Sequence, residues 1–191
     1  MQHDLWRAVF GNARPVEIEI GPGRGDVVAA FAHAYPGVNF FGIEAQPWYA
    51  DRAQARAERL GLANVRVIAA DARCVLRNVI PAGSVQAYHV YFPDPWPKKR
   101  HEKRRLFAVG VAGDMRRTLV PGGVVYLATD LPDVLATMRA SLLGAGFTPD
   151  RAVPARVRPV TRFEEKYAGA GTHEAAFRAP IPRAHAGTAP A

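Results

Sequence analysis

The sequence predicts an α/β fold in which a parallel sheet carries helices on both of its faces. Runs typical of buried strands alternate with segments of helical periodicity through five units, and turns rich in glycine or proline separate them. A carboxylate also stands at or just past the end of each strand. Ligands of such sheets bind beyond the carboxyl ends of the strands. The carboxylates are Glu19, Glu44, Asp71, Asp94 and Asp130.

The first part of the chain contains three strands and two long helices. Apolar residues at Val27, Val28, Phe31 and Tyr35 fall near one face of the first helix. Gly61 is the stop signal of the second helix. The expected elements are a strand at 16–20, a helix at 26–35, a strand at 38–44, a helix at 47–60 and a strand at 64–71.

The second part continues the alternation and ends in a tail. A helix is expected to begin in the basic segment, because Leu106, Val109 and Met115 offer it an apolar face. We expect one domain over 1–180 and a disordered tail over 181–191. The other expected elements are a short helix at 72–80, a strand at 84–92, the helix at 103–119, a strand ending at Asp130, a helix at 132–146 and a strand at 174–178.

Composition narrows the function classes. The 191 residues are 49% hydrophobic and carry a net charge of +8, which favours an anionic partner such as a nucleic acid. Cys74 is the only cysteine, so no intramolecular disulfide and no cysteine zinc site is expected. No apolar run suggests a signal peptide or a membrane span, and we expect a soluble cytoplasmic protein. His89, His101 and His173 lack metal-ligand spacing, so no metal is expected.

Three glycines, Gly21, Gly23 and Gly25, follow the first strand, and Glu44 ends the next one. The glycines by themselves could form only a tight strand-to-helix turn. A carboxylate at the position of Glu44 can accept two hydrogen bonds from a ribose, which favours a nucleoside ligand. Glu19 precedes the loop and would repel a pyrophosphate. A cationic cofactor such as S-adenosylmethionine therefore fits better than a nicotinamide dinucleotide.

Asp71 follows the third strand, where it could reach the adenine of a ligand held by Glu44. It could also cap the short helix that follows, and both roles are compatible.

The segment FPDPWPKKRHEKRR places Asp94 between two prolines, which fix where its carboxylate points. Phe92 and Trp96 beside it are either core residues or stacking surfaces for a base. The basic run after them is either a solvated helix start or a binding surface for phosphates. Bound phosphates would offset the unfavourable positive charge at a helix amino terminus. Its cations are Lys98, Lys99, Arg100, Lys103, Arg104 and Arg105.

Five segments together resemble the bacterial tRNA (guanine-N7)-methyltransferases. They are EIGPGRG, FFGIE, FPDPWPKKRHEKRRL, ATD and RPVTRFEEK, and the resemblance extends from Leu5 to Arg178. It implies a Rossmann-like class I methyltransferase fold with a mostly parallel seven-stranded sheet. It also implies methyl transfer from S-adenosylmethionine to N7 of a guanosine in the variable loop of tRNA. The amino-terminal extension common in that family is expected to be short or absent.

The resemblance also implies the roles of individual residues. Asp94 would be the catalytic residue, placed between cofactor and base. The cofactor would be bound by Glu19, Gly21, Gly23, Gly25, Glu44, Asp71 and Asp94. The substrate would be bound by Lys98, Asp130, Thr161, Arg162, Phe163 and Glu164, although TRFE could also be a simple strand-entry turn. The RNA would be contacted by Arg100, His101, Glu102, Lys103, Arg104 and Arg105.

Chemistry favours the same role for Asp94. Guanine N7 has an exposed lone pair and no proton to lose, so its methylation needs in-line placement rather than a general base. The methylated base gains positive charge, which a nearby carboxylate stabilises. Three rival functions share part of the pattern: a methyltransferase for small molecules or exocyclic amines, a non-catalytic RNA-binding protein on a degenerate methyltransferase fold, and a nicotinamide-dependent enzyme.

Overall fold

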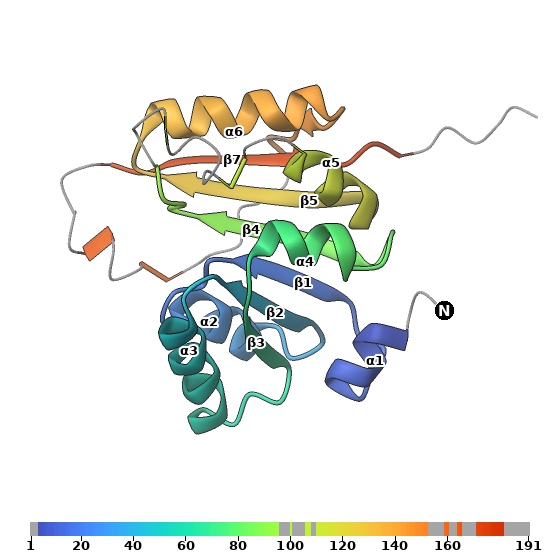
Figure 1. Cartoon of the computed structure of the whole chain (residues 1–191), viewed down its shortest axis with the longest axis vertical. Coiled ribbons are helices and arrows are strands. Elements are labelled where there is room, and N and C mark those ends of the chain that lie inside the picture. The colour runs from blue at the N-terminus through green and yellow to red at the C-terminus, as the bar shows by residue number, and fades with distance from the viewer. Residues whose placement is uncertain are drawn as a thin grey trace, which may run out of the picture.

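The computed structural model describes residues 4–95, 100, 106–107, 110–152, 159–160, 164–165 and 171–181. Its helices and strands alternate along the chain (Figure 1). The strands are β1 (Val16–Ile20), β2 (Asn39–Glu44), β3 (Val65–Ala69), β4 (Val85–Tyr91), β5 (Leu119–Thr129), β6 (Thr148–Pro149) and β7 (His173–Arg178). The helices are α1 (Asp4–Phe10), α2 (Asp26–Ala34), α3 (Pro47–Arg59), α4 (Ala72–Asn78), α5 (Val111–Thr118) and α6 (Pro132–Gly144).

The strands form one seven-stranded sheet in the order β3-β2-β1-β4-β5-β7-β6. Neighbours from β3 through β5 are parallel, and β7 is antiparallel to both β5 and β6. The prediction of a mostly parallel sheet of seven strands is therefore confirmed. The order reverses direction between β1 and β4, which is where α/β sheets open a crevice for ligands.

Helices cover both faces of the sheet, because successive side chains of a strand point to opposite sides. Phe40 of β2 packs in a cluster with α2 and α3, and the next residue, Phe41, packs in a second cluster with residues of α1, α4, α5 and α6. Every residue of β1 is consequently buried. Continuous burial is typical of a central parallel strand.

The register brings the ends of the parallel strands to one edge. Ile20 pairs with Ile43 and Val90, and Tyr91 pairs with Ala128. The loops that carry the predicted site residues after β1, β2, β4 and β5 therefore leave the sheet on the same side. Within the described ranges, no helix has the length and apolarity needed to cross a membrane.

The prediction of one helix over 103–119 is wrong in its first part. Leu106 and Phe107 lie in a turn, and Gly110 has a φ of 98°, so α5 begins only at Val111. That backbone conformation is incompatible with a right-handed helix, and the apolar spacing alone did not reveal it. His101 to Arg105 lie outside the described residues. The sequence also did not predict α1 or the two-residue strand β6.

Candidate functional site

The loop between β1 and α2 contains the three predicted glycines, and their surroundings differ. Gly21 and Gly23 have φ angles of 73° and 55°, and a methyl group added to either would meet no other atom within 4 Å. Space is therefore open above this backbone. Gly25 instead lies against α3, where an added Cβ would stand 2.9 Å from the Cβ of Ala53. The first two glycines leave room for a ligand, whereas the third allows α2 and α3 to approach each other.

Glu44 holds the glycine loop to the start of α3. Its Oε2 accepts a hydrogen bond from the Gly23 N–H at 3.0 Å, and its Oε1 accepts one from the Gln46 N–H at 3.0 Å. The side chain is buried, with 8% of its surface exposed. Because each carboxylate oxygen can accept a second hydrogen bond, these contacts leave acceptor capacity for the hydroxyls of a ligand.

A proline of the loop rests on β2 through a contact that the sequence did not reveal. Pro22 is buried, and a Cβ added at Gly42 would lie 3.1 Å from its Cγ and 3.1 Å from a methyl of Val67. The missing side chain at Gly42 therefore gives the loop its place on the sheet. Glu19 is the register partner of Gly42 on β1 and is 4% exposed.

Asp71 caps helix α4, as one of its two predicted roles required. Its Oδ1 accepts a hydrogen bond from the Arg73 N–H at 2.9 Å. The Arg73 guanidinium also binds both carboxylate oxygens, at 3.1 Å from Nε and 2.6 Å from Nη2. These side-chain hydrogen bonds hold the pKa of Asp71 below its ordinary value of 3.8. The contact between Asp71 and an adenine stays a prediction.

Asp94 stands on a turn that leaves β4 in an unusual conformation. Phe92 has a φ of 49°, and its N–H donates to the Ala128 carbonyl at 2.8 Å. A residue other than glycine rarely adopts this φ, and such strain clusters at functional sites. Pro93 and Pro95 flank Asp94, whose side chain is exposed. The conformation of this turn therefore sets the direction in which the Cα–Cβ bond of Asp94 leaves the backbone.

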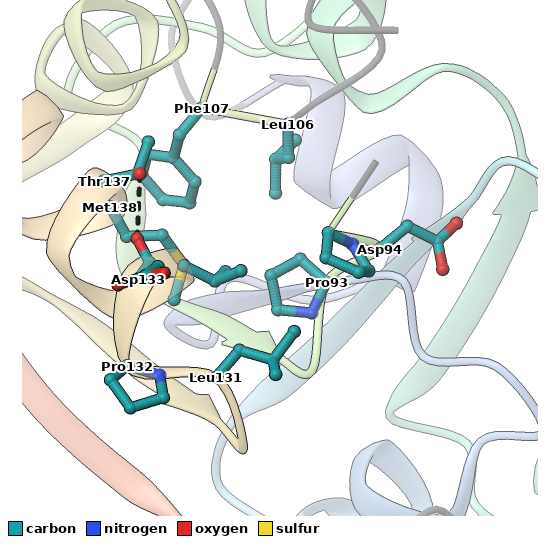
Figure 2. A pocket seen from close by; sticks show the side chains of 11 residues that line it. Pro93, Asp94, Leu106, Phe107, Leu131, Pro132, Asp133, Thr137 and Met138 are labelled. Carbon is teal, nitrogen blue, oxygen red and sulfur yellow. Dashed lines mark hydrogen bonds between the residues drawn. The ribbon is translucent and has the colours of Figure 1, made fainter. Parts of the chain in front are cut away.

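A cavity of about 330 Å³ lies beside this turn. Figure 2 shows that the Asp94 carboxylate points away from the cavity. Thr137 stands on the opposite wall, where its hydroxyl donates a hydrogen bond of 2.9 Å to the Asp133 carbonyl. Its walls are largely apolar. The lining residues are Pro93, Asp94, Pro95, Leu106, Phe107, Leu131, Pro132, Asp133, Val134, Thr137 and Met138.

A buried polar network below the site was missed by the sequence analysis. The His89 Nε2 lies 2.8 Å from the Glu17 Oε2, and the His89 Nδ1 lies 2.8 Å from the Tyr91 hydroxyl. The imidazole also stacks on Tyr126 with an angle of 4° between the rings. Glu17 and His89 are almost fully buried. The sequence did contain one signal of this network, since Glu17 and His89 are polar residues within two strands that are otherwise largely apolar.

The remaining predicted residues are described only in part. Arg100 is exposed, and Asp130 is half-buried directly after β5. Glu164 is half-buried, and its Oε1 accepts a hydrogen bond from the Thr172 hydroxyl at 3.2 Å. Lys98, His101, Glu102, Lys103, Arg104, Arg105, Thr161, Arg162 and Phe163 lie outside the described residues. In the part of the chain that the structure describes, no three side chains of His, Cys, Asp or Glu gather in a way that could hold a metal ion.

Comparison with solved structures supports the fold assignment. An aminoglycoside resistance methyltransferase, NpmB1, superposes with a TM-score of 0.61 over 94% of this chain and 93% of its own, at 18% identity. A 16S rRNA (adenine(1408)-N(1))-methyltransferase from Catenulisporales acidiphilia gives a TM-score of 0.61 over 96% and 94% of the two chains, at 16% identity. At such identities the likeness shows the fold alone. With the observed strand order, it is the class I methyltransferase fold.

Sequence comparison gives the family. A family model described as "Putative methyltransferase" matches residues 13–176. The tRNA (guanine-N(7)-)-methyltransferase of Methylococcus capsulatus is 40% identical over 165 residues, which are 83% of this chain and 71% of the relative. That of Geobacter metallireducens is 47% identical over 128 residues, which are 67% and 61%. The chain thus spans about two thirds of the length of these relatives. It belongs to the tRNA (guanine-N(7)-)-methyltransferase family.

Proposed function

We propose that this protein transfers a methyl group from S-adenosylmethionine to N7 of a guanosine in the variable loop of tRNA. One observation carries the proposal: the open glycine loop, the buried carboxylates Glu19 and Glu44 and the exposed carboxylate Asp94 all lie at one edge of a class I methyltransferase sheet. Family membership names the base and the RNA.

The residues of the loop fit the implied cofactor. S-adenosylmethionine supplies a methyl group on a positively charged sulfonium. Gly21 and Gly23 present backbone with open space above it, so a ligand can approach closely. Glu44 is fixed by two backbone donors and keeps acceptor capacity for ribose hydroxyls. Glu19, directly before the loop, would attract the positive groups of the methionine end.

Asp94 would orient the guanine and stabilise the positive charge that develops on it. Since N7 carries no proton, methylation there requires no general base, and placement of the lone pair dominates. The strained backbone at Phe92 and the two flanking prolines limit the directions that Asp94 can take. A carboxylate held in this way favours a cationic product more strongly than a freely rotating one.

The tRNA contacts are proposed from the family motifs and from charge. Lys98, Asp130 and the TRFE segment at 161–164 would contact the target nucleotide, and the basic residues of 100–105 would follow the backbone. The net charge of +8 suits a polyanionic partner. We further propose that the protein works in the cytoplasm as a monomer or homodimer, without an obligate protein partner.

Incubation with methyl-labelled S-adenosylmethionine and unmodified tRNA transcripts tests the proposal. Nucleoside mass spectrometry should give 7-methylguanosine, and chain cleavage at that base should map it to the variable loop. A matched transcript with adenosine in place of the target guanosine should take up no label. Label on an exocyclic amine or on a small molecule would instead support the rival methyltransferase, and absence of transfer in all arms would support the non-catalytic RNA-binding protein.

A further inference from the structure

Two aromatic side chains at the start of α3 are exposed. Trp48 exposes 53% of its surface and Tyr49 exposes 36%. Their rings touch edge to face, with centroids 4.9 Å apart and an angle of 75°. The helix packs on the sheet through small side chains, Ala50, Ala53 and Ala57, so the indole is not part of its buried face. Exposed tryptophan of this kind is typical of binding surfaces.

Two guanidinium groups accompany the indole. The Cζ of Arg52 lies 4.2 Å from the centroid of the Trp48 ring, and that of Arg24 lies 5.9 Å from it. Among the described residues neither cation is paired with a carboxylate, whereas Arg56, one turn further along α3, binds Asp26 at 2.6 Å. Arg24 and Arg52 therefore keep their donors for another anion. We call Arg24, Trp48, Tyr49 and Arg52 the Trp48 cluster.

The cluster lies at the same edge of the sheet as Asp94. Arg24 belongs to the loop after β1, and Trp48 follows the end of β2 by four residues. In the sheet β2, β1 and β4 are successive neighbours, so the ends of β2 and β4 are about 10 Å apart at normal strand spacing. An RNA that presents a base to Asp94 would thus pass within reach of the cluster.

We propose that the Trp48 cluster is a second contact surface for the tRNA substrate, where an unpaired base stacks on the indole and the two arginines bind the adjoining phosphates. Combined aromatic and cationic side chains are the usual means of holding single-stranded nucleic acid. The charge of the cluster favours RNA over the cofactor as its occupant, because S-adenosylmethionine carries a net positive charge, whereas each nucleotide of an RNA carries a negative one. The proposal rests on the proposed function, which supplies the tRNA.

Filter binding of an unmodified tRNA transcript, measured over a range of salt concentrations, tests the cluster without requiring turnover. Trp48→Ala should weaken binding about tenfold, within the range for loss of one base stack, and should leave the salt slope unchanged. Trp48→Phe should restore part of the affinity. The double variant Arg24→Ala, Arg52→Ala should lower the slope by about 1.4 to 1.8, as expected for two phosphates. Leu143→Ala, an exposed apolar residue on α6, is the control and should change neither.

Calorimetric titration of the same variants with S-adenosylmethionine separates the two occupants. Its affinity should stay within about twofold of the unaltered protein. The proposal is overturned if Trp48→Ala binds tRNA normally, or if that variant loses cofactor affinity instead. The proposed function fails separately: an unaltered protein that binds tRNA through the cluster but forms no 7-methylguanosine would contradict the activity and leave the surface intact. An unaltered protein that binds no tRNA would contradict both.

Discussion

The two halves of the candidate site are held in place by different means. In the glycine-loop half, Glu44 is buried and both of its oxygens are bound by backbone donors of the chain itself. In the Asp94 half, the carboxylate is exposed and stands on a turn that the left-handed torsion of Phe92 and the rings of Pro93 and Pro95 restrict. One half is thus fixed by hydrogen bonds and the other by covalent restriction of the backbone.

Because the two halves are held differently, they would also respond differently to ligands. The glycine-loop half has its acceptors in place before a ligand arrives, so little ordering is required on binding. Asp94 remains solvated until a substrate covers it. Exclusion of water then strengthens its interaction with positive charge, because electrostatic energies rise as the local dielectric constant falls.

Asp94→Ala should lower the rate of single-turnover methyl transfer by about 100- to 1000-fold, the range for loss of one group that stabilises transition-state charge. Cofactor affinity should fall much less than the rate, since the glycine-loop half, which would supply most of the cofactor contacts, is untouched. Asp133→Ala, which alters the other carboxylate beside the cavity, is the matched control and should retain most activity. A nearly normal rate in Asp94→Ala would remove the role assigned to that residue.

Two glycines of the same loop should differ in their tolerance of alanine. Gly25→Ala combines a left-handed backbone with a clash at 2.9 Å, so it should lose about 1 to 2 kcal/mol from strain and about 1 to 3 kcal/mol from overpacking. Gly21→Ala has the strain and no clash, and should lose only about 1 to 2 kcal/mol. Urea unfolding of both variants checks the difference, and equal losses would show that the contact with Ala53 is easily relieved.

Glu44→Gln should loosen the glycine loop. Both carboxylate oxygens of Glu44 accept hydrogen bonds from backbone N–H groups, and glutamine replaces one of these oxygens by an amide nitrogen, which cannot accept. One unsatisfied donor costs about 1 to 3 kcal/mol, and the free energy of unfolding should fall by a value in this range. Cofactor affinity, measured by calorimetry, should fall as well. Glu58→Gln on the exposed side of α3, where Gln54 donates to the carboxylate at 2.9 Å, is the control. A loss of stability or cofactor affinity confined to Glu58→Gln would contradict the role of Glu44 in holding the glycine loop to α3.

Asp71→Asn should have the smallest effect, because asparagine also caps a helix and the variant loses only the exposed ion pair with Arg73, including the hydrogen bond from Nη2 to Oδ2. Since Arg73 lowers the folded-state pKa of Asp71, the ion pair stabilises the folded protein above the ordinary value of 3.8, and this stability is lost as the pH falls through the folded-state pKa. The side chain is 49% exposed, so the difference at pH 7 should be about 0.2 to 1 kcal/mol. Unfolding measured from pH 7 into the acid range should show the difference at pH 7 and its disappearance as the pH falls through the folded-state pKa of Asp71.

The sequence predicted the features that depend on neighbours along the chain. Alternating strands and helices predicted the sheet, and the position of Glu44 at a strand end placed it beside the glycine loop. The two possible roles of Asp71 included the cap that the structure shows. In each case the determining contacts are local or follow from the common edge of parallel strands, so spacing along the chain was sufficient.

Features that depend on pairing between distant strands could not be predicted in this way. Glu17 and His89 are 72 residues apart, and their contact follows from the register of β1 against β4, which no single sequence reveals. The start of α5 was misplaced for a different reason. Apolar spacing extended the predicted helix back to Lys103, whereas the φ angle of Gly110 makes α5 begin only at Val111. A hydrophobic pattern contains no information about such a torsion.

The contact between Pro22 and Gly42 has a consequence for variation at these two positions. A methyl group at position 42 would stand 3.1 Å from the proline ring at position 22 and 3.1 and 3.2 Å from two methyl groups of Val67, which is closer than an ordinary van der Waals contact. A smaller residue at position 22 would remove one of these contacts and leave the two to Val67, which would still have to shift by a few tenths of an ångström to accept the methyl group. The two positions are therefore expected to change together in evolution, with alanine at 42 accommodated more easily once the proline has been replaced.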